Sequence, residues 1–306
     1  MNPDRTGLDT IQVPQGRRSP KDGRVLRAAI DRRLSALFPD EPRGGALAEA
    51  VRYAVVTPGK RIRPALAVLA SWELGCDDLR ALDPGCALEM VHAASLVLDD
   101  LPCMDDAPLR RGMASTHAAF GEDVAVLASI TLLSRAFAIL ASAPGLTAEQ
   151  RPRLVAILAE AVGAEGLAGG QFRDLRGAAG PRLLTGIAEA NHLKTGALFV
   201  AAVEMAGVLA GRSPARVAAL RGFAIELGQA FQILDDLADG QSGNGEDAGK
   251  ATLLSCLGQE GARDRLDRHL SKARDALQPG GALAMFVGSI FDRSGREIAQ
   301  ASAVPA

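Results

Sequence analysis

Apolar residues recur at three- and four-residue spacing in long blocks along this chain of 306 residues. Residues at that spacing share one face of a helix, whereas strictly alternating Val, Ile and Thr segments are nearly absent. The pattern therefore predicts an all-α fold. Helices are expected near residues 23–37, 45–56, 64–74, 83–101, 121–142, 147–175, 186–209, 214–240, 251–276 and 280–300.

Proline and glycine mark the breaks between these segments. They occur at Thr57-Pro58-Gly59, Asp83-Pro84-Gly85 and Pro279-Gly280-Gly281, among other places. None of the breaks is typical of a linker between domains. We expect one helical domain over residues 23–306, preceded by a mobile polar tail over residues 1–22.

Composition narrows the class of protein. The chain is 48% hydrophobic and 23% charged with a net charge of −2, which is typical of a soluble protein and gives no reason to expect a nucleic-acid partner. The longest charge-poor apolar runs, 124–133 and 198–209, are expected to be too short for a stable membrane span. No secretory signal opens the chain, and the four cysteines show no CxxC pairing, so a cytoplasmic protein with reduced thiols is expected.

The first of two acidic clusters is Asp99-Asp100-Leu101-Pro102-Cys103-Met104-Asp105-Asp106, at the end of an apolar helical stretch. Carboxylates at a helix C-terminus face the negative end of the helix dipole, which is unfavourable without a cation. Asp99 and Asp105 do not share a face of a straight helix. A loop at Pro102 is predicted to bring Asp105 back beside Asp99.

The second cluster is Asp235-Asp236-Leu237-Ala238-Asp239. Asp235 and Asp239 are four residues apart and stack on one helix face, where like charges repel unless a cation lies between them. Hard carboxylate oxygens suit Mg²⁺, which typically bridges carboxylates to substrate phosphates. The alternative is that each cluster is only a solvated acidic helix end, and the presence of two clusters favours the metal.

Basic residues suited to a diphosphate accompany both clusters. Arginine matches pairs of phosphate oxygens and lysine adds a compact charge. His92 lies two helical turns before Asp99 and is interpreted as a hydrogen-bond donor to substrate, whereas His117 and His192 are taken as structural. The basic candidates are Lys60, Arg61, Arg63, Arg110, Arg111, Lys194 and Lys250.

At these residues the chain resembles the trans-prenyl diphosphate synthase family, most closely its bacterial geranylgeranyl diphosphate synthases. The matching motifs stand in family order and cover roughly residues 45–260. They are GKRIRP, DDLPCMDDAPLRRG, GGQFRDL, NHLKTG, GQAFQILDDLAD and DAGKATL.

The resemblance implies a magnesium-dependent prenyltransferase that joins isopentenyl diphosphate head to tail to an allylic diphosphate. It also implies a single-domain bundle of about ten or more helices around a deep central cavity, usually as a homodimer. Three Mg²⁺ ions are expected, held by Asp99, Asp105, Asp235 and Asp239. The allylic diphosphate is expected to be bound by Arg110, Lys194, Thr195, Gln232 and Lys250, and isopentenyl diphosphate by Lys60, Arg63, His92 and Arg111.

Product length is argued from the helix turn before Asp99. Ala94 and Ser95 are interpreted as the floor of the product pocket, where related farnesyl-making bacterial enzymes carry an aromatic residue at the position of Ala94. A turn of about 5.4 Å is close to one isoprene unit, so small residues here favour the twenty-carbon product. The chain departs from close relatives in lacking a lysine between Asp239 and Lys250. The alternatives are a farnesyl diphosphate synthase, a noncatalytic subunit of a heteromeric synthase, and a terpene cyclase.

Overall fold

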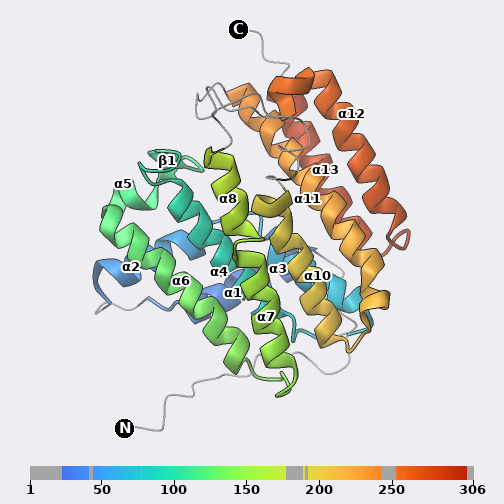
Figure 1. Cartoon of the computed structure of the whole chain (residues 1–306), viewed down its shortest axis with the longest axis horizontal. Coiled ribbons are helices and arrows are strands. Elements are labelled where there is room, and N and C mark those ends of the chain that lie inside the picture. Colours follow the sequence, from blue (N-terminus) through green and yellow to red (C-terminus); the bar gives the residue numbers. More distant parts are fainter. Residues whose placement is uncertain are drawn as a thin grey trace.

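The computed structural model describes residues 23–40, 44–76, 78–176, 189, 192–242 and 253–301, with the backbone alone at 239–242 and 293–301. Almost all of this part of the chain is helical (Figure 1). The helices are α1 (Gly23–Leu37), α2 (Gly45–Val56), α3 (Ile62–Glu73), α4 (Leu82–Asp99), α5 (Thr116–Phe120), α6 (Glu122–Ser142), α7 (Gln150–Val162), α8 (Leu167–Arg176), the π-helix η2 (His192–Gly196), α10 (Ala197–Leu209), α11 (Pro214–Ser242), α12 (Leu253–Asp275) and α13 (Ala282–Ala301). The all-α prediction is confirmed.

Three helices form the centre of the molecule because they are apolar on every side. In α3, α4 and α10 nearly every residue is buried, polar positions included. A helix that is hydrophobic all round has to be covered on all faces. The helices α2 and α6 cover α4 on one side, and α7 and α11 cover α10 on the other, with α12 and α13 against α11 (Figure 1).

The central helices approach one another closely near the start of α3. A Cβ atom at Gly85 of α4 would lie 2.9 Å from the Cα atom of Pro64 in the first turn of α3. Pro64 is tolerated there because the first turn of a helix leaves backbone N–H groups unpaired in any case. This contact fixes the start of α3 against α4, which carries the first acidic cluster at its other end.

Several elements differ from those expected, including the short helix α5, which was not predicted. The segment predicted as one helix over 147–175 is two helices, α7 and α8, because the chain turns at residues 163–166. A short antiparallel hairpin of β1 (Leu109–Arg110) and β2 (Met113–Ala114) follows the first acidic cluster. The segment before α10 is a π-helix.

The sequence predicted that the apolar runs are too short to cross a membrane. That prediction is wrong, because some helices are long and apolar enough to do so. Within the described residues, 122–142, 192–209 and 214–238 are long and apolar enough, because a span tolerates the one or two charges that were used to divide these runs. In the second and third of these windows, 67% and 56% of the residues are buried inside the protein, compared with 39% in the first. The first, α6, therefore keeps an exposed apolar face.

Candidate active site

The first acidic cluster folds back on itself at the end of α4. Asp99 is the last residue of the helix, and the chain turns through residues 101–105. The backbone N–H of Asp105 donates a hydrogen bond of 2.9 Å to the carbonyl of Asp99. The turn that Pro102 predicts therefore brings Asp105 next to Asp99.

Burial makes the carboxylates of this cluster costly to charge. Burial is the main cause that raises the pKa of Asp99, and the nearby charge of Asp105 adds to it, whereas Lys194 opposes the shift. The Lys194 Nζ atom lies 3.6 Å from Asp99 Oδ2 and 3.4 Å from Asp174 Oδ2. The Lys194 ammonium group therefore supplies positive charge beside the carboxylate of Asp99.

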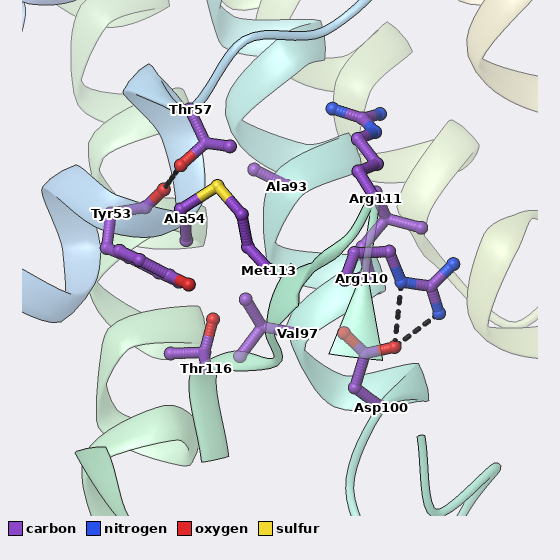
Figure 2. Close-up of a pocket in the computed structure, with 11 residues that line it drawn as sticks. Tyr53, Ala54, Thr57, Ala93, Val97, Asp100, Arg110, Arg111, Met113 and Thr116 are labelled. Carbon is purple, nitrogen blue, oxygen red and sulfur yellow. Dashed lines mark hydrogen bonds and ion pairs between the residues drawn. The ribbon is translucent and has the colours of Figure 1, made fainter. Parts of the chain in front are cut away.

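Arg110 is held by the second carboxylate of the cluster. Asp100 is 2% exposed and accepts hydrogen bonds from both Nε and Nη2 of Arg110, the first at 2.9 Å. Figure 2 shows the Arg110 guanidinium turned toward Asp100 and that of Arg111 turned away from it. The two consecutive arginines therefore point to different sides of the hairpin, Arg110 toward Asp100 and Arg111 toward the carbonyl of Pro58.

The second acidic cluster lies on α11 and is connected to η2. Thr195 Oγ1 lies 2.8 Å from Gln232 Oε1, and Gln232 Nε2 donates to Asp236 Oδ1 at 2.9 Å. Asp235 precedes Asp236 in the chain, and its Oδ1 atom lies 3.8 Å from Lys60 Nζ. The side chain of Asp239 and the whole of Lys250 lie outside the described residues.

The short π-helix η2 joins the two clusters. Its Lys194 contacts Asp99 at the end of α4, and the next residue, Thr195, contacts Gln232 on α11. Gly228 of α11 packs on Gly196, and a Cβ atom at Gly228 would lie 2.9 Å from the Gly196 Cα atom. The two acidic clusters therefore converge on one region of the protein.

Arg63 and Arg111, two of the residues predicted for isopentenyl diphosphate, form a basic group beside the acidic clusters. Arg63 is 7% exposed, its guanidinium lies 5.2 Å from the ring centre of Phe199, and its buried Nε atom has no hydrogen-bond partner among the described residues. Burial is the main cause that lowers the pKa of Arg63 and of Arg111. The charge of Arg111 lowers the pKa of Arg63 further, and the charges of Arg61 and Arg110 lower that of Arg111. A buried, unpaired donor among crowded cations is a site suited to an anion such as a diphosphate.

His92 lies close to the same arginines. Burial, followed by the charges of Arg63 and Arg111, lowers its pKa well below the usual value. The imidazole is therefore neutral at physiological pH in the absence of substrate, which suits a hydrogen-bonding role.

Glu89, Asp174 and Arg61 are charged residues of this region to which the sequence analysis assigned no role beyond the basic character of Arg61. Glu89 is 4% exposed and pairs with Arg61 at 3.0 Å, and Asp174 pairs with Lys194. Glu89 could have been noticed in the sequence, because it is a carboxylate inside the otherwise apolar stretch 86–98 and therefore needs a buried partner.

The proposed floor residues lie on different sides of α4. Ala94 is fully buried, and its carbonyl accepts a hydrogen bond of 3.3 Å from Ser129 on α6. Ser95 is partly exposed. One hollow of about 50 Å³ lies between α2, α4 and the hairpin (Figure 2), and another of about 390 Å³ lies between α1, α2 and α6. Neither is lined by both clusters, so the deep central cavity stays a prediction.

The residues present fit a magnesium site. Asp99 and Asp105 lie together, and lysine ammonium groups lie within 3.8 Å of Asp99 and Asp235, where positive charge is needed. No group of three potential metal ligands is formed within the described residues, which omit the Asp239 side chain. The oxygen-only donor set is the chemistry that Mg²⁺ prefers.

The polyprenyl synthetase family model matches residues 45–254, a range that includes both acidic clusters, the basic loop and η2. The chain belongs to the polyprenyl synthetase family. It is a prenyltransferase of a family that generally uses Mg²⁺.

The relatives of this polyprenyl synthetase agree with that assignment. It is 46% identical to the geranylgeranyl diphosphate synthase of Pantoea ananas over 280 residues, 88% of this chain and 92% of that protein. It is 44% identical to the geranylgeranyl diphosphate synthase of Pseudescherichia vulneris, covering 86% and 89%. It superimposes on an FPP/GFPP synthase of Zymomonas mobilis with a TM-score of 0.78 at 37% identity, covering 90% and 96%.

Proposed function

We propose that this enzyme condenses isopentenyl diphosphate with allylic diphosphates and releases geranylgeranyl diphosphate, using three Mg²⁺ ions. The observation that carries the proposal is the convergence of the two acidic clusters through η2, with the arginine group beside them. Two relatives that share 44–46% of their residues with the chain carry the name geranylgeranyl diphosphate synthase.

The residues divide into two diphosphate subsites. Each residue of the first subsite contacts an acidic cluster or a residue beside one: Lys194 contacts Asp99, Arg110 contacts Asp100, and Thr195 contacts Gln232 on α11. The residues that would hold the allylic diphosphate are Lys194, Thr195, Gln232 and Arg110. Arg63, Arg111, His92 and Lys60 would hold isopentenyl diphosphate. Magnesium, when bound to Asp99, Asp105 and Asp235, supplies positive charge to the leaving diphosphate.

Lys194 and Arg110 stabilise the negative charge that develops on the leaving diphosphate as the allylic carbon–oxygen bond breaks. The double bond of isopentenyl diphosphate then attacks the allylic carbon, and a proton is lost to the released diphosphate. An aliphatic lining of the predicted cavity would exclude water, which would otherwise trap the allylic cation. The mechanism needs no protein nucleophile.

Product length is the second part of the proposal. Ala94 is small and buried, so Ala94→Phe should shift the product toward fifteen carbons. An unchanged product would contradict the assignment of the floor to Ala94.

The test is an incubation of the purified chain with Mg²⁺, isopentenyl diphosphate and each of dimethylallyl, geranyl and farnesyl diphosphate, followed by sizing of the products. We expect a twenty-carbon diphosphate that disappears when EDTA is added. Accumulation of the fifteen-carbon product would favour a farnesyl diphosphate synthase. No diphosphate release with any substrate would overturn the enzymatic proposal.

A homodimer in the cytoplasm completes the proposal. The exposed face of α6 carries Val126, Leu127 and Ile130, which are 38%, 50% and 54% exposed. An antiparallel pair of α6 helices about a two-fold axis would bury these apolar residues between the two subunits. This arrangement leaves no need for lipid to cover α6.

A further inference from the structure

Arg61 adopts a backbone conformation that a residue with a side chain normally avoids. It precedes α3 with φ +50° and ψ +38°, in the left-handed region. Glycine is the usual residue there because a Cβ atom is disfavoured. An arginine in this conformation indicates that its side-chain contacts offset the backbone strain.

The Arg61 side chain makes four hydrogen bonds to three helical elements. Nε donates to Asp31 on α1 at 2.9 Å, and Nη1 donates to Glu89 on α4 at 3.0 Å. Nη2 donates to the carbonyls of Val56 and Thr57 at the end of α2, at 3.2 and 2.9 Å. The Arg61 and Glu89 side chains are 4% and 5% exposed, so the bond between them is shielded from water.

These contacts fix the loop that leads to the isopentenyl diphosphate subsite. Arg61 holds the loop at the carbonyls of Val56 and Thr57, and Arg111 donates to the next carbonyl, that of Pro58, at 3.3 Å. A Cβ atom at Gly59 would lie 2.6 Å from Arg111 Nη1. Figure 2 shows Thr57 at the end of α2, with its hydroxyl group bonded to the carbonyl of Tyr53.

Glu89 interacts both with Arg61 and with the cations of the isopentenyl diphosphate subsite. It is buried, pairs with Arg61, and its charge acts on Arg63 and Arg111. His92 follows Glu89 by three residues on α4, so the two lie on neighbouring positions of one helix face. The Arg61–Glu89 pair therefore lies behind the loop and the cationic group.

We propose that Arg61 is a positioning residue for the isopentenyl diphosphate subsite: its four-point anchoring of the 57–61 loop sets the places of Lys60, Arg63 and Arg111. The inference rests on the proposed function. A misplacement of about 1 Å at such a subsite costs up to about a hundredfold in rate, so loss of the anchor should weaken one substrate selectively.

The chain offers a matched control for a purely structural role. Arg33 on α1 donates to both carboxylate oxygens of Asp83 on α4, at 2.6 and 3.0 Å, and is also largely buried. The Arg33–Asp83 pair joins α1 to α4, two of the helices that Arg61 contacts, and it does not involve the 57–61 loop. Arg33→Lys should weaken packing as Arg61→Lys does, without a change in substrate binding.

The experiment measures KM for isopentenyl diphosphate and for farnesyl diphosphate, each at saturation of the other, in the full-length chain with Mg²⁺. Arg61→Lys keeps the charge but cannot make four bonds, so KM for isopentenyl diphosphate should rise about tenfold, with KM for farnesyl diphosphate within about twofold. Arg33→Lys should leave both KM values unchanged. Parallel changes in both KM values in Arg61→Lys, or no change in either, would overturn the inference.

A second variant decides the matter if Arg61→Lys does not fold. Asp31 has a 44% exposed side chain, so Asp31→Ala removes one of the four bonds with little effect on folding. KM for isopentenyl diphosphate should rise about two- to threefold, and an unchanged value would contradict the proposal. A wild-type chain without condensation activity would overturn the proposed function and this inference with it, whereas an active chain with unchanged KM values in the variants overturns this inference alone.

Discussion

The carboxylates of the first cluster differ in their surroundings although they are close in sequence. Asp99 and Asp100 are buried, and Asp106 is exposed with a left-handed backbone. Spacing and proline identify the cluster from sequence, because a turn at Pro102 has to return the chain. The Arg61 network was not predictable, since its partners Asp31 and Glu89 are 30 and 28 residues away in the chain.

Replacement of single carboxylates in this loop should distinguish the metal-binding position Asp99 from the exposed Asp106. Asp99→Asn should reduce kcat by about a hundredfold or more, because it removes charge needed to hold the cation at the leaving group. Asp106→Asn is the matched control, since asparagine tolerates the left-handed backbone, and it should retain activity within about threefold. Steady-state rates of diphosphate release check both, and equal losses in the two variants would contradict the assignment.

His92 gives a prediction for the pH dependence of stability. Its pKa is lowered in the folded protein, so between that value and about 6.5 the unfolded state binds more protons. Stability should therefore fall as the pH decreases below 6.5, by at most about 1.4 kcal/mol per pH unit from this group, and His92→Gln should remove that part of the loss. Urea unfolding of both proteins at pH 7.5 and pH 5.5 measures the difference. The same loss in both proteins would show that His92 does not contribute.

At the scale of elements, most helices could be predicted because their apolar spacing is regular. The bounds of α1 and α2 agree with those predicted to the residue. The hairpin was missed because strands of two residues carry no alternating pattern, and the π-helix because its form depends on packing against α8 and α11. The break between α7 and α8 was missed because glycine is compatible with a helix and the sequence there continues the helical spacing.

The contact between α11 and η2 should matter more for activity than for folding. Gly228→Ala places a Cβ atom against the backbone of Gly196, which would move η2 and with it Lys194 and Thr195. We expect a destabilisation of about 1–3 kcal/mol and at least about tenfold weaker use of the allylic substrate. Thermal unfolding and KM for farnesyl diphosphate measure the two effects.

Gly222 on the same helix provides the control. A Cβ atom there meets nothing within 4 Å. Gly222→Ala should leave KM unchanged and stabilise the protein by about 0.5–1 kcal/mol, because alanine favours the helix. If the two variants change KM to the same extent, close packing at Gly228 is not what places η2.

At the scale of the whole molecule, α6 carries a group of exposed apolar side chains, Val126, Leu127 and Ile130, that a single copy leaves uncovered. Ile130→Asp should convert the proposed dimer to a monomer, because it places a charge at the centre of the buried face. Met285→Asp is the control, since Met285 is 49% exposed on α13, away from α6. Light scattering on eluted protein gives the mass of each. A monomeric wild-type protein, or dissociation of both variants, would contradict the α6 interface.

The central claim is that both acidic clusters act on one diphosphate. A crystal structure of the chain with Mg²⁺ and inorganic diphosphate tests it most directly. The account predicts a single diphosphate with metal ions ligated by Asp99 and Asp105 on one side and by Asp235 on the other. Metal ions at only one cluster, or two separate diphosphates with no shared ion, would contradict it.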